Sequence, residues 1–258
     1  MGVAALLLQA TGNITFYPIC LIAATIGGVL VFSWRIGRIG SRPCFDTRRV
    51  LKTMWGDRNA ALTVVAAGTY SATPVAIMGL VSPFSAVAQF SSADKLYRIA
   101  SFSIQVLGNS FQGWVAEDRP VGISRRMKAS LLAHSVLGLC GFAGLALLGA
   151  PLTHLLFGDE IAATELTAIW YGVTFAAVSM NTSMGRHILI PLGRTNIVLA
   201  STLTGAVFGV VAMAVLGLKF GSSGGAAGLA IGEIVVCLVQ VGGLILLRRR
   251  ARSTPLVP

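Results

Sequence analysis

The chain has 258 residues, of which 55% are hydrophobic and 11% are charged, and its formal net charge is +11. A soluble domain usually carries about 25% charged residues, so this composition cannot supply the surface of a soluble domain of this length. The excess of Lys and Arg does not indicate nucleic-acid binding, because no basic patch alternates with aromatic residues.

The first half of the chain alternates between apolar blocks and basic connections. A span needs about 20 apolar residues, so block 2–9 is too short and block 16–34 is the first full span. The connection 35–58 follows, with seven basic residues and two acids. Residues 60–80 form the next predicted span, in which Pro74 predicts a kink.

A long helix is expected from Pro83 to about Trp114. At 1.5 Å per residue it would be about 48 Å long, so it must tilt within the bilayer or protrude from it. A second basic connection, 117–128, separates this helix from a span over 131–157.

Three further spans complete the pattern, over 166–190, 197–218 and 226–247, and the glycines of 221–225 predict a tight turn before the last one. The sequence therefore predicts an all-α membrane protein, a polytopic helical bundle of about seven transmembrane helices. Residues 1–258 are expected to form a single transmembrane domain.

The basic residues predict the orientation of the bundle. If connection 35–58 is cytoplasmic, alternation places 17 of the 20 Lys and Arg on that side, with Arg186 counted in the loop that follows it. Lys219 alone lies on the opposite side, and Lys95 and Arg98 lie inside a span. The positive-inside rule then makes the basic loops and the C-terminus cytoplasmic.

Other chemistry finds no support in the residue spacing. The cysteines (Cys20, Cys44, Cys140 and Cys237) form no CxxC pair, and the histidines (His134, His154 and His187) are scattered. We therefore expect no disulfide framework, no metal site and no cofactor. No signal peptide is recognised at the N-terminus. No P-loop, serine elbow or HExxH motif is recognised either, so the chain is not expected to be an enzyme.

A polar stripe runs along the helix that begins after Pro83. Its members recur every three or four residues and so share one helical face; they are Ser91, Asp94, Arg98, Ser101, Gln105, Gly108 and Gln112. Such a face cannot lie against lipid, because its donors and acceptors would go unsatisfied. It must line a cavity or bond to another helix.

Two interpretations of the stripe remain open. In one, Asp94 and Arg98 neutralise each other as an i,i+4 pair and hold helices together. In the other, Arg98 and Lys95 bind an anionic substrate in a water-filled cavity, Asp94 orients Arg98, and Gln105 and Gln112 extend the polar surface. The planar donor fork of Arg suits phosphate, so the second interpretation predicts a phosphate-bearing substrate.

Glu233 is a second charged residue inside a predicted span. It could bind a proton or cation for ion coupling, or it could be an acid that is hydrogen-bonded to a neighbouring helix. Gly224, Gly228 and Gly232 repeat every four residues on the same helix, and two further glycines, at 205 and 209, repeat the spacing one span earlier. This spacing is typical of closely packed helices.

Residues 89–98, with the sequence QFSSADKLYR, resemble a helix of the polysaccharide flippase branch of the multidrug/oligosaccharidyl-lipid/polysaccharide exporter superfamily. Residues 155–158 and 190–196 are similar to further segments of that family, and the resemblance covers roughly residues 14–250. Members typically have twelve to fourteen spans in two lobes, so this chain resembles the C-terminal half, either as a truncated product or as a half-transporter.

The resemblance implies transport of an undecaprenyl-pyrophosphate-linked glycan, such as an O-antigen repeat unit, across the bacterial inner membrane. The partners that the resemblance implies are the lipid bilayer, the lipid-linked glycan, and a second lobe or a second copy of the chain. Lys95 and Arg98 match the family helix by position. One alternative is a small-molecule/cation antiporter of the superfamily that depends on Glu233. Another is a membrane enzyme of the same glycan pathway, which would normally carry a large outward loop; here that loop is only 158–165.

Overall fold

A computed structural model describes residues 16–38, 47–56, 58–117 and 123–253, and the regular elements in these ranges are all helical. This confirms the predicted all-α fold. The chain divides into two compact units, residues 1–56 and residues 57–258, and each is described by itself.

The first unit contains two described helices, α2 (Phe16–Arg38) and α3 (Thr47–Gly56). Helix α2 agrees with the predicted span over 16–34. Helix α3 lies within connection 35–58, for which the sequence predicted no helix, and its Trp55 side chain is exposed. The short apolar block 2–9 lies outside the described residues.

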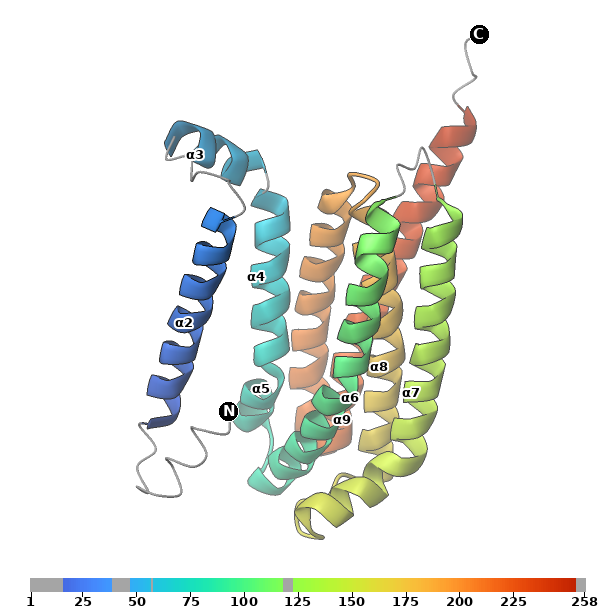
Figure 1. The fold of residues 1–258 in the computed structure, drawn as a ribbon. Helices are drawn as coiled ribbons and strands as arrows, with labels where there is room; N and C mark the ends of the chain where they lie inside the picture. Colours follow the sequence, from blue (N-terminus) through green and yellow to red (C-terminus); the bar gives the residue numbers. More distant parts are fainter. Residues whose placement is uncertain (1–15, 39–46, 57, 118–122, 254–258) are drawn as a thin grey trace. The chain divides into compact units, whose positions relative to one another are not determined.

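The second unit carries the remaining described helices (Figure 1). They are α4 (Arg58–Ala72), α5 (Pro74–Val81), α6 (Phe84–Ala116), α7 (Arg125–Phe157), α8 (Glu165–Thr182), the π-helix η1 (Ser183–Leu189) and α9 (Thr195–Ser253). The predicted helix from Pro83 to about Trp114 corresponds closely to α6.

The expected kink at Pro74 is present. Helices α4 and α5 meet at an angle of 41°, and Pro74 occupies the first turn of α5. Proline has no N–H to donate and fits the first turn of a helix, so the chain ends one helix and starts the next at this position.

Helix α9 is a hairpin of two antiparallel arms joined at Gly221, whose φ of 59° and ψ of −133° are not helical (Figure 1). Glycine adopts this backbone conformation without the steric cost that a side chain brings. The arms pack closely: a Cβ on Gly228 would overlap the backbone N of Met213, and one on Gly205 would lie 2.8 Å from the carbonyl O of Gly232. The structure therefore confirms both the turn predicted at 221–225 and the close helix packing predicted from the glycine spacing.

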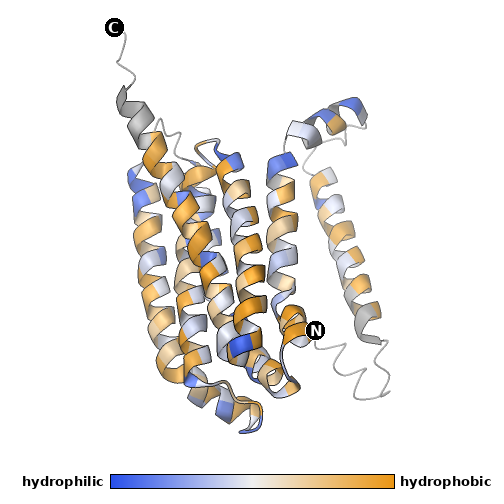
Figure 2. Ribbon diagram, turned by 180° about the vertical axis from the view of Figure 1, so that it is seen from behind, coloured by the Kyte–Doolittle hydropathy of each residue, from blue (hydrophilic) through white to orange (hydrophobic). Residues whose placement is uncertain are grey.

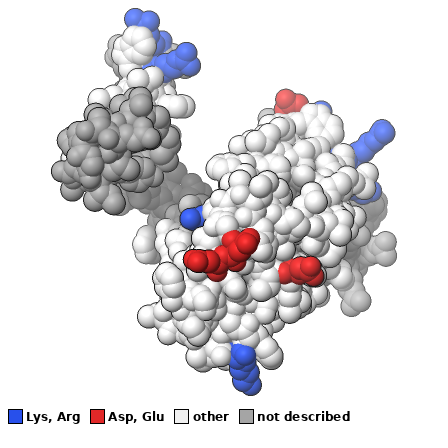
Figure 3. Space-filling view, turned by 90° about the horizontal axis from the view of Figure 1, so that it is seen from below, with Lys and Arg blue, Asp and Glu red and all other residues white. Residues whose placement is uncertain are grey.

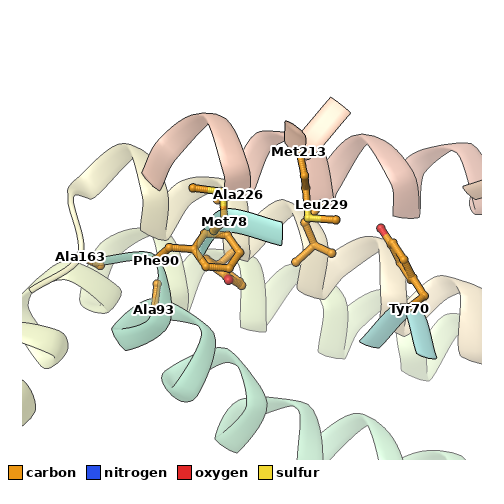
Figure 4. Close-up of a cluster of buried hydrophobic side chains, with 9 residues drawn as sticks. Tyr70, Met78, Phe90, Ala93, Ala163, Met213, Ala226 and Leu229 are labelled. Atoms are coloured by element: carbon orange, nitrogen blue, oxygen red, sulfur yellow. The ribbon is translucent and has the colours of Figure 1, made fainter. Parts of the chain in front are cut away.

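A cluster of buried side chains joins helices α4, α5, α6, α8 and α9 (Figure 4). Phe90 of α6 and Met78 of α5 are fully buried and lie close to Ala226, while Met213 and Leu229 face each other across the hairpin. Small residues on α9 leave room for these larger side chains, so the glycine spacing and the core belong to one packing arrangement.

The helices of the second unit are rich in hydrophobic residues, as the hydropathy colours show (Figure 2), and many of their large apolar side chains are exposed. Leu80 and Phe84 are each 87% exposed, which an aqueous surface does not favour and a lipid environment does. Within the described residues, α7 and residues 195–247 are long and apolar enough to cross a membrane, and the bent pair α4–α5 adds a third span if it crosses as one. The count of seven spans stays a prediction.

Candidate functional site

The polar stripe of α6 is built around an ion pair. Arg98 Nε donates to Asp94 Oδ2 over 2.5 Å, one helical turn apart, and the Tyr171 hydroxyl of α8 donates to Asp94 Oδ1 over 3.4 Å. The Asp94 side chain is 6% exposed, whereas that of Arg98 is 48% exposed. The carboxylate is therefore fixed between two helices, and much of the guanidinium surface stays accessible.

Aromatic rings hold the Tyr171 hydroxyl in place. The Tyr171 ring lies 5.5 Å from the Phe90 ring and 5.4 Å from the Tyr97 ring, centroid to centroid, in tilted arrangements that aromatic pairs favour. Tyr171 is 1% exposed and belongs to the same buried cluster as Phe90. The packing thus positions the hydroxyl that bonds to Asp94.

This geometry bears on both interpretations of the pair. The Tyr171 bond connects α6 to α8, as helix clipping requires. The exposed part of Arg98 is what binding of an anion requires. The substrate-binding role of Asp94 and Arg98 stays a prediction.

Lys95 points toward the end of α7. Its Nζ lies 5.5 Å from the centroid of the Phe157 ring, a cation–π arrangement, and the residue is exposed. No carboxylate lies within ion-pair distance of Lys95 in the part of the chain that the structure describes. Its charge is therefore not neutralised there, although its predicted role in substrate binding is untested.

The rest of the stripe divides into exposed and buried positions. Gln105 and Gln112 are exposed, Ser101 donates to the backbone O of Tyr97, and Gly108 is buried. Gln112 accepts a hydrogen bond from Arg186 of η1. The stripe therefore continues into a second polar cluster at the other end of α6.

Arg186 is the residue that sequence reasoning placed differently. It was counted with the loop after its span, but it lies in η1, and its Nη2 also donates to Asn109 Oδ1 over 2.9 Å. A π-helix widens the helical turn and often marks a functional site. Neither Asn109 nor the π-helix has a sequence signal that periodicity could detect.

Two buried histidines support this cluster from behind. His187 Nε2 faces the Gly108 carbonyl O at 2.9 Å, so it must donate, and Nδ1 then accepts from Ser130 Oγ at 2.7 Å. Ser183 Oγ lies 3.1 Å from Ser130 Oγ and extends the chain of bonds. His187 thus connects η1 to both α6 and α7.

His134 completes the pair, with its ring centroid 5.2 Å from that of His187. Its Nδ1 bonds to the carbonyl O of Ser130 at 2.9 Å, whereas its buried Nε2 has no partner among the described residues. No sequence pattern indicated this pair, because 53 positions separate the two residues. No group of three metal-binding side chains occurs in the described ranges.

Glu233 bonds to a neighbouring helix. Asn181 Nδ2 of α8 donates to Glu233 Oε2 over 3.0 Å and to the Glu233 carbonyl O over 3.1 Å. This is the arrangement expected of an acid that holds two helices together. Whether Glu233 also takes part in ion coupling stays a prediction.

Comparison with known proteins gives one relative. The chain is 22% identical over 217 residues to a Shigella dysenteriae protein named "Putative O-antigen transporter". The match covers 84% of this chain and 55% of the relative, so the chain spans about half the length of the protein it matches. No protein-family model matches the chain. No solved structure matches it.

Proposed function

We propose that the chain is one lobe, the C-terminal one, of a transporter that moves polyprenyl-pyrophosphate-linked oligosaccharide across the bacterial inner membrane. The similarity to an O-antigen transporter supports a role in polysaccharide transport. The long apolar helices and the many exposed apolar side chains support a membrane protein (Figure 2). The relative is a transporter by name, which supports a transport role over an enzymatic one.

The observation that carries the proposal is the accessible Arg98 on a helix that the sequence predicts to cross the membrane. A charge within a span is costly and is retained where it has a function. Asp94 and Tyr171 bond on the buried side of the pair, and about half of the Arg98 side-chain surface is exposed and can be reached by a phosphate. Lys95, one residue after Asp94, adds a second cation on the same stretch of α6.

The second lobe is part of the proposal. A single lobe supplies one wall of a transport pathway, and the relative is nearly twice as long as the matched region. A separate chain with the first lobe, or a second copy of this chain, would supply the other wall.

Charge distribution supports the cytoplasmic placement of the C-terminus. The α7–α8 connection carries Asp159 and Glu160, both exposed. Seen from that end, the second unit is mostly uncharged, with acidic groups near the centre and few basic ones (Figure 3). Basic residues gather at the opposite ends of the spans, as the positive-inside rule requires for the cytoplasmic side.

Replacement of Arg98 tests the function. In the strain that encodes the chain, R98A should abolish most surface glycan, measured by immunoblot, and R98K should restore part of it because the charge remains without the planar fork. R125A is the matched control, since Arg125 is an exposed arginine at the start of α7. Normal glycan export by R98A, at equal protein level, would overturn the proposed site.

The cation antiporter is the second candidate, because Glu233 is an acidic residue within the apolar segment 195–247. It predicts that transport depends on the Glu233 carboxylate and on an ion gradient. A membrane enzyme of the glycan pathway has less support, because the α7–α8 connection is only 158–164.

A further inference from the structure

We infer that Arg186 is a second phosphate-binding residue, at the end of α6 opposite Arg98, and that it takes the diphosphate group of the lipid-linked substrate. The inference rests on the proposed function and assigns a residue that sequence analysis had counted only for topology.

Three arginines lie on α6 or against it, and their hydrogen-bond partners differ in charge. Arg98 pairs with Asp94, and Arg126 pairs with Glu117 at 3.0 Å while it stacks on Trp114. Arg186 has the amide oxygens of Asn109 and Gln112 instead, and no described carboxylate lies within ion-pair distance of it. Arg186 therefore lacks the counter-charge that the other two have.

Amide oxygens orient a guanidinium without cancelling its charge. Both bonds to α6 use Nη2, so among the described residues the Nε–H and Nη1–H groups make no hydrogen bond. Nη2 belongs to both bidentate edges of the guanidinium, so these remaining donors offer a phosphate single hydrogen bonds together with the uncancelled charge. An oriented cation with donors of this kind is suited to an anionic ligand.

The surroundings hold Arg186 in this position. The next residue, His187, is anchored to the Gly108 carbonyl of α6 and to Ser130 of α7. Gly108 leaves the space that the guanidinium uses, since a Cβ there would lie 3.4 Å from Arg186 Nη1 and 3.3 Å from Thr182 Cγ2. Preorganisation of this kind reduces the entropy lost when a ligand binds.

The position of Arg186 along the bundle suggests its place in transport. Its partners Asn109 and Gln112 follow Arg98 on α6 by 11 and 14 residues, which corresponds to about 16 to 21 Å. Arg186 lies next to the basic end of the spans, the predicted cytoplasmic side. A substrate that enters from the cytoplasm would meet Arg186 first and Arg98 second.

Binding to the full chain in lipid nanodiscs tests the inference, with farnesyl diphosphate as probe. R186Q should raise the Kd for this probe about tenfold to a hundredfold, because it removes a charged hydrogen-bond donor. The glutamine of R186Q keeps an amide donor for Asn109 and Gln112. Thermal unfolding of the variant will verify that it is folded. R126Q is the matched control and should bind as the unmodified chain does. Farnesol and inorganic pyrophosphate form separate arms that distinguish the lipid-borne diphosphate from the free anion.

The outcomes separate the two proposals. Unchanged affinity in R186Q together with weaker binding in R98Q would overturn the role of Arg186 and leave the proposed function intact. Failure of the unmodified chain to bind farnesyl diphosphate would overturn the proposed function itself. Preference for inorganic pyrophosphate over farnesyl diphosphate would overturn the lipid-linked substrate.

A second measurement needs no variant. Phenylglyoxal modifies accessible arginines, and farnesyl diphosphate should slow the modification of Arg186, followed by mass spectrometry of its peptide. Arg125, exposed at the start of α7, is the internal reference and should react at the same rate with and without the probe. Equal rates at Arg186 would overturn the inference.

Discussion

The two oxygens of Asp94 bond to different helices: Oδ2 accepts from Arg98 on α6 at 2.5 Å, and Oδ1 accepts from the Tyr171 hydroxyl on α8 at 3.4 Å. The buried carboxylate thus holds the half-exposed guanidinium in a fixed orientation relative to α8. Any role of Arg98 in binding then depends on Asp94 as a positioning residue.

Replacement of Asp94 by Asn tests this dependence. D94N keeps the shape of the side chain and removes its charge, so Arg98 loses its orientation while its own charge remains. We expect surface glycan to fall between the levels of the unmodified chain and R98A. Y171F is the comparison: it removes one long hydrogen bond and should lower the free energy of unfolding by about 0.5–1.5 kcal/mol. Full export by D94N would contradict a positioning role.

The hairpin of α9 gives a second prediction. G228A should lower the free energy of unfolding by about 1–3 kcal/mol, because the added Cβ overlaps the Met213 backbone and forces the arms apart. G144A is the matched control, since nothing lies within 4 Å of a Cβ there. It should be neutral or slightly stabilising, as alanine favours helix. Thermal unfolding in detergent measures both, and equal effects would contradict close packing.

The sequence predicted the parts of this fold that depend on local chemistry. Pro74 predicted a bend because its ring cannot continue a helix, and the glycines near Gly221 predicted the reversal because only such residues take a positive φ easily. The spacing of Gly205, Gly228 and others predicted close contact. These features need only a few neighbouring residues to be recognised.

The second polar cluster depends on tertiary contacts and was missed. His134 and His187 meet because α7 packs on η1, and Arg186 in η1 bonds to Asn109 because η1 also packs on α6. Neither relationship follows from periodicity, which assigned Arg186 to a loop. The stripe on α6 was predicted as one face, but periodicity cannot tell which of its members another helix covers.

The His187 anchor gives a third prediction. H187A removes bonds to Gly108 and Ser130 and leaves buried polar groups unsatisfied, so the free energy of unfolding should fall by about 1–3 kcal/mol. H154A is the control, because His154 is exposed and its described ion pair is with the exposed Asp159. Its change should stay within about 0.5 kcal/mol. Comparable losses in both variants would show that His187 does not anchor η1.

Replacement of Glu233 separates the flippase from the antiporter. E233Q keeps an oxygen that can accept from Asn181, so the contact between α8 and α9 should persist and surface glycan should remain near normal. The antiporter predicts the opposite, because a neutral side chain cannot exchange a cation. Loss of transport with an unchanged melting temperature would favour ion coupling at Glu233.

The orientation of the bundle can be tested on a single arm of α9. Arg194 precedes this arm and Lys219 lies at its far end, about 38 Å apart along a straight helix, which exceeds the roughly 30 Å hydrocarbon core. In a variant without its four native cysteines, K219C should react with an impermeant maleimide in intact spheroplasts, and R194C only after permeabilisation. The reverse pattern would place the basic loops outside. Reaction of both before permeabilisation would mean that this arm does not cross the membrane.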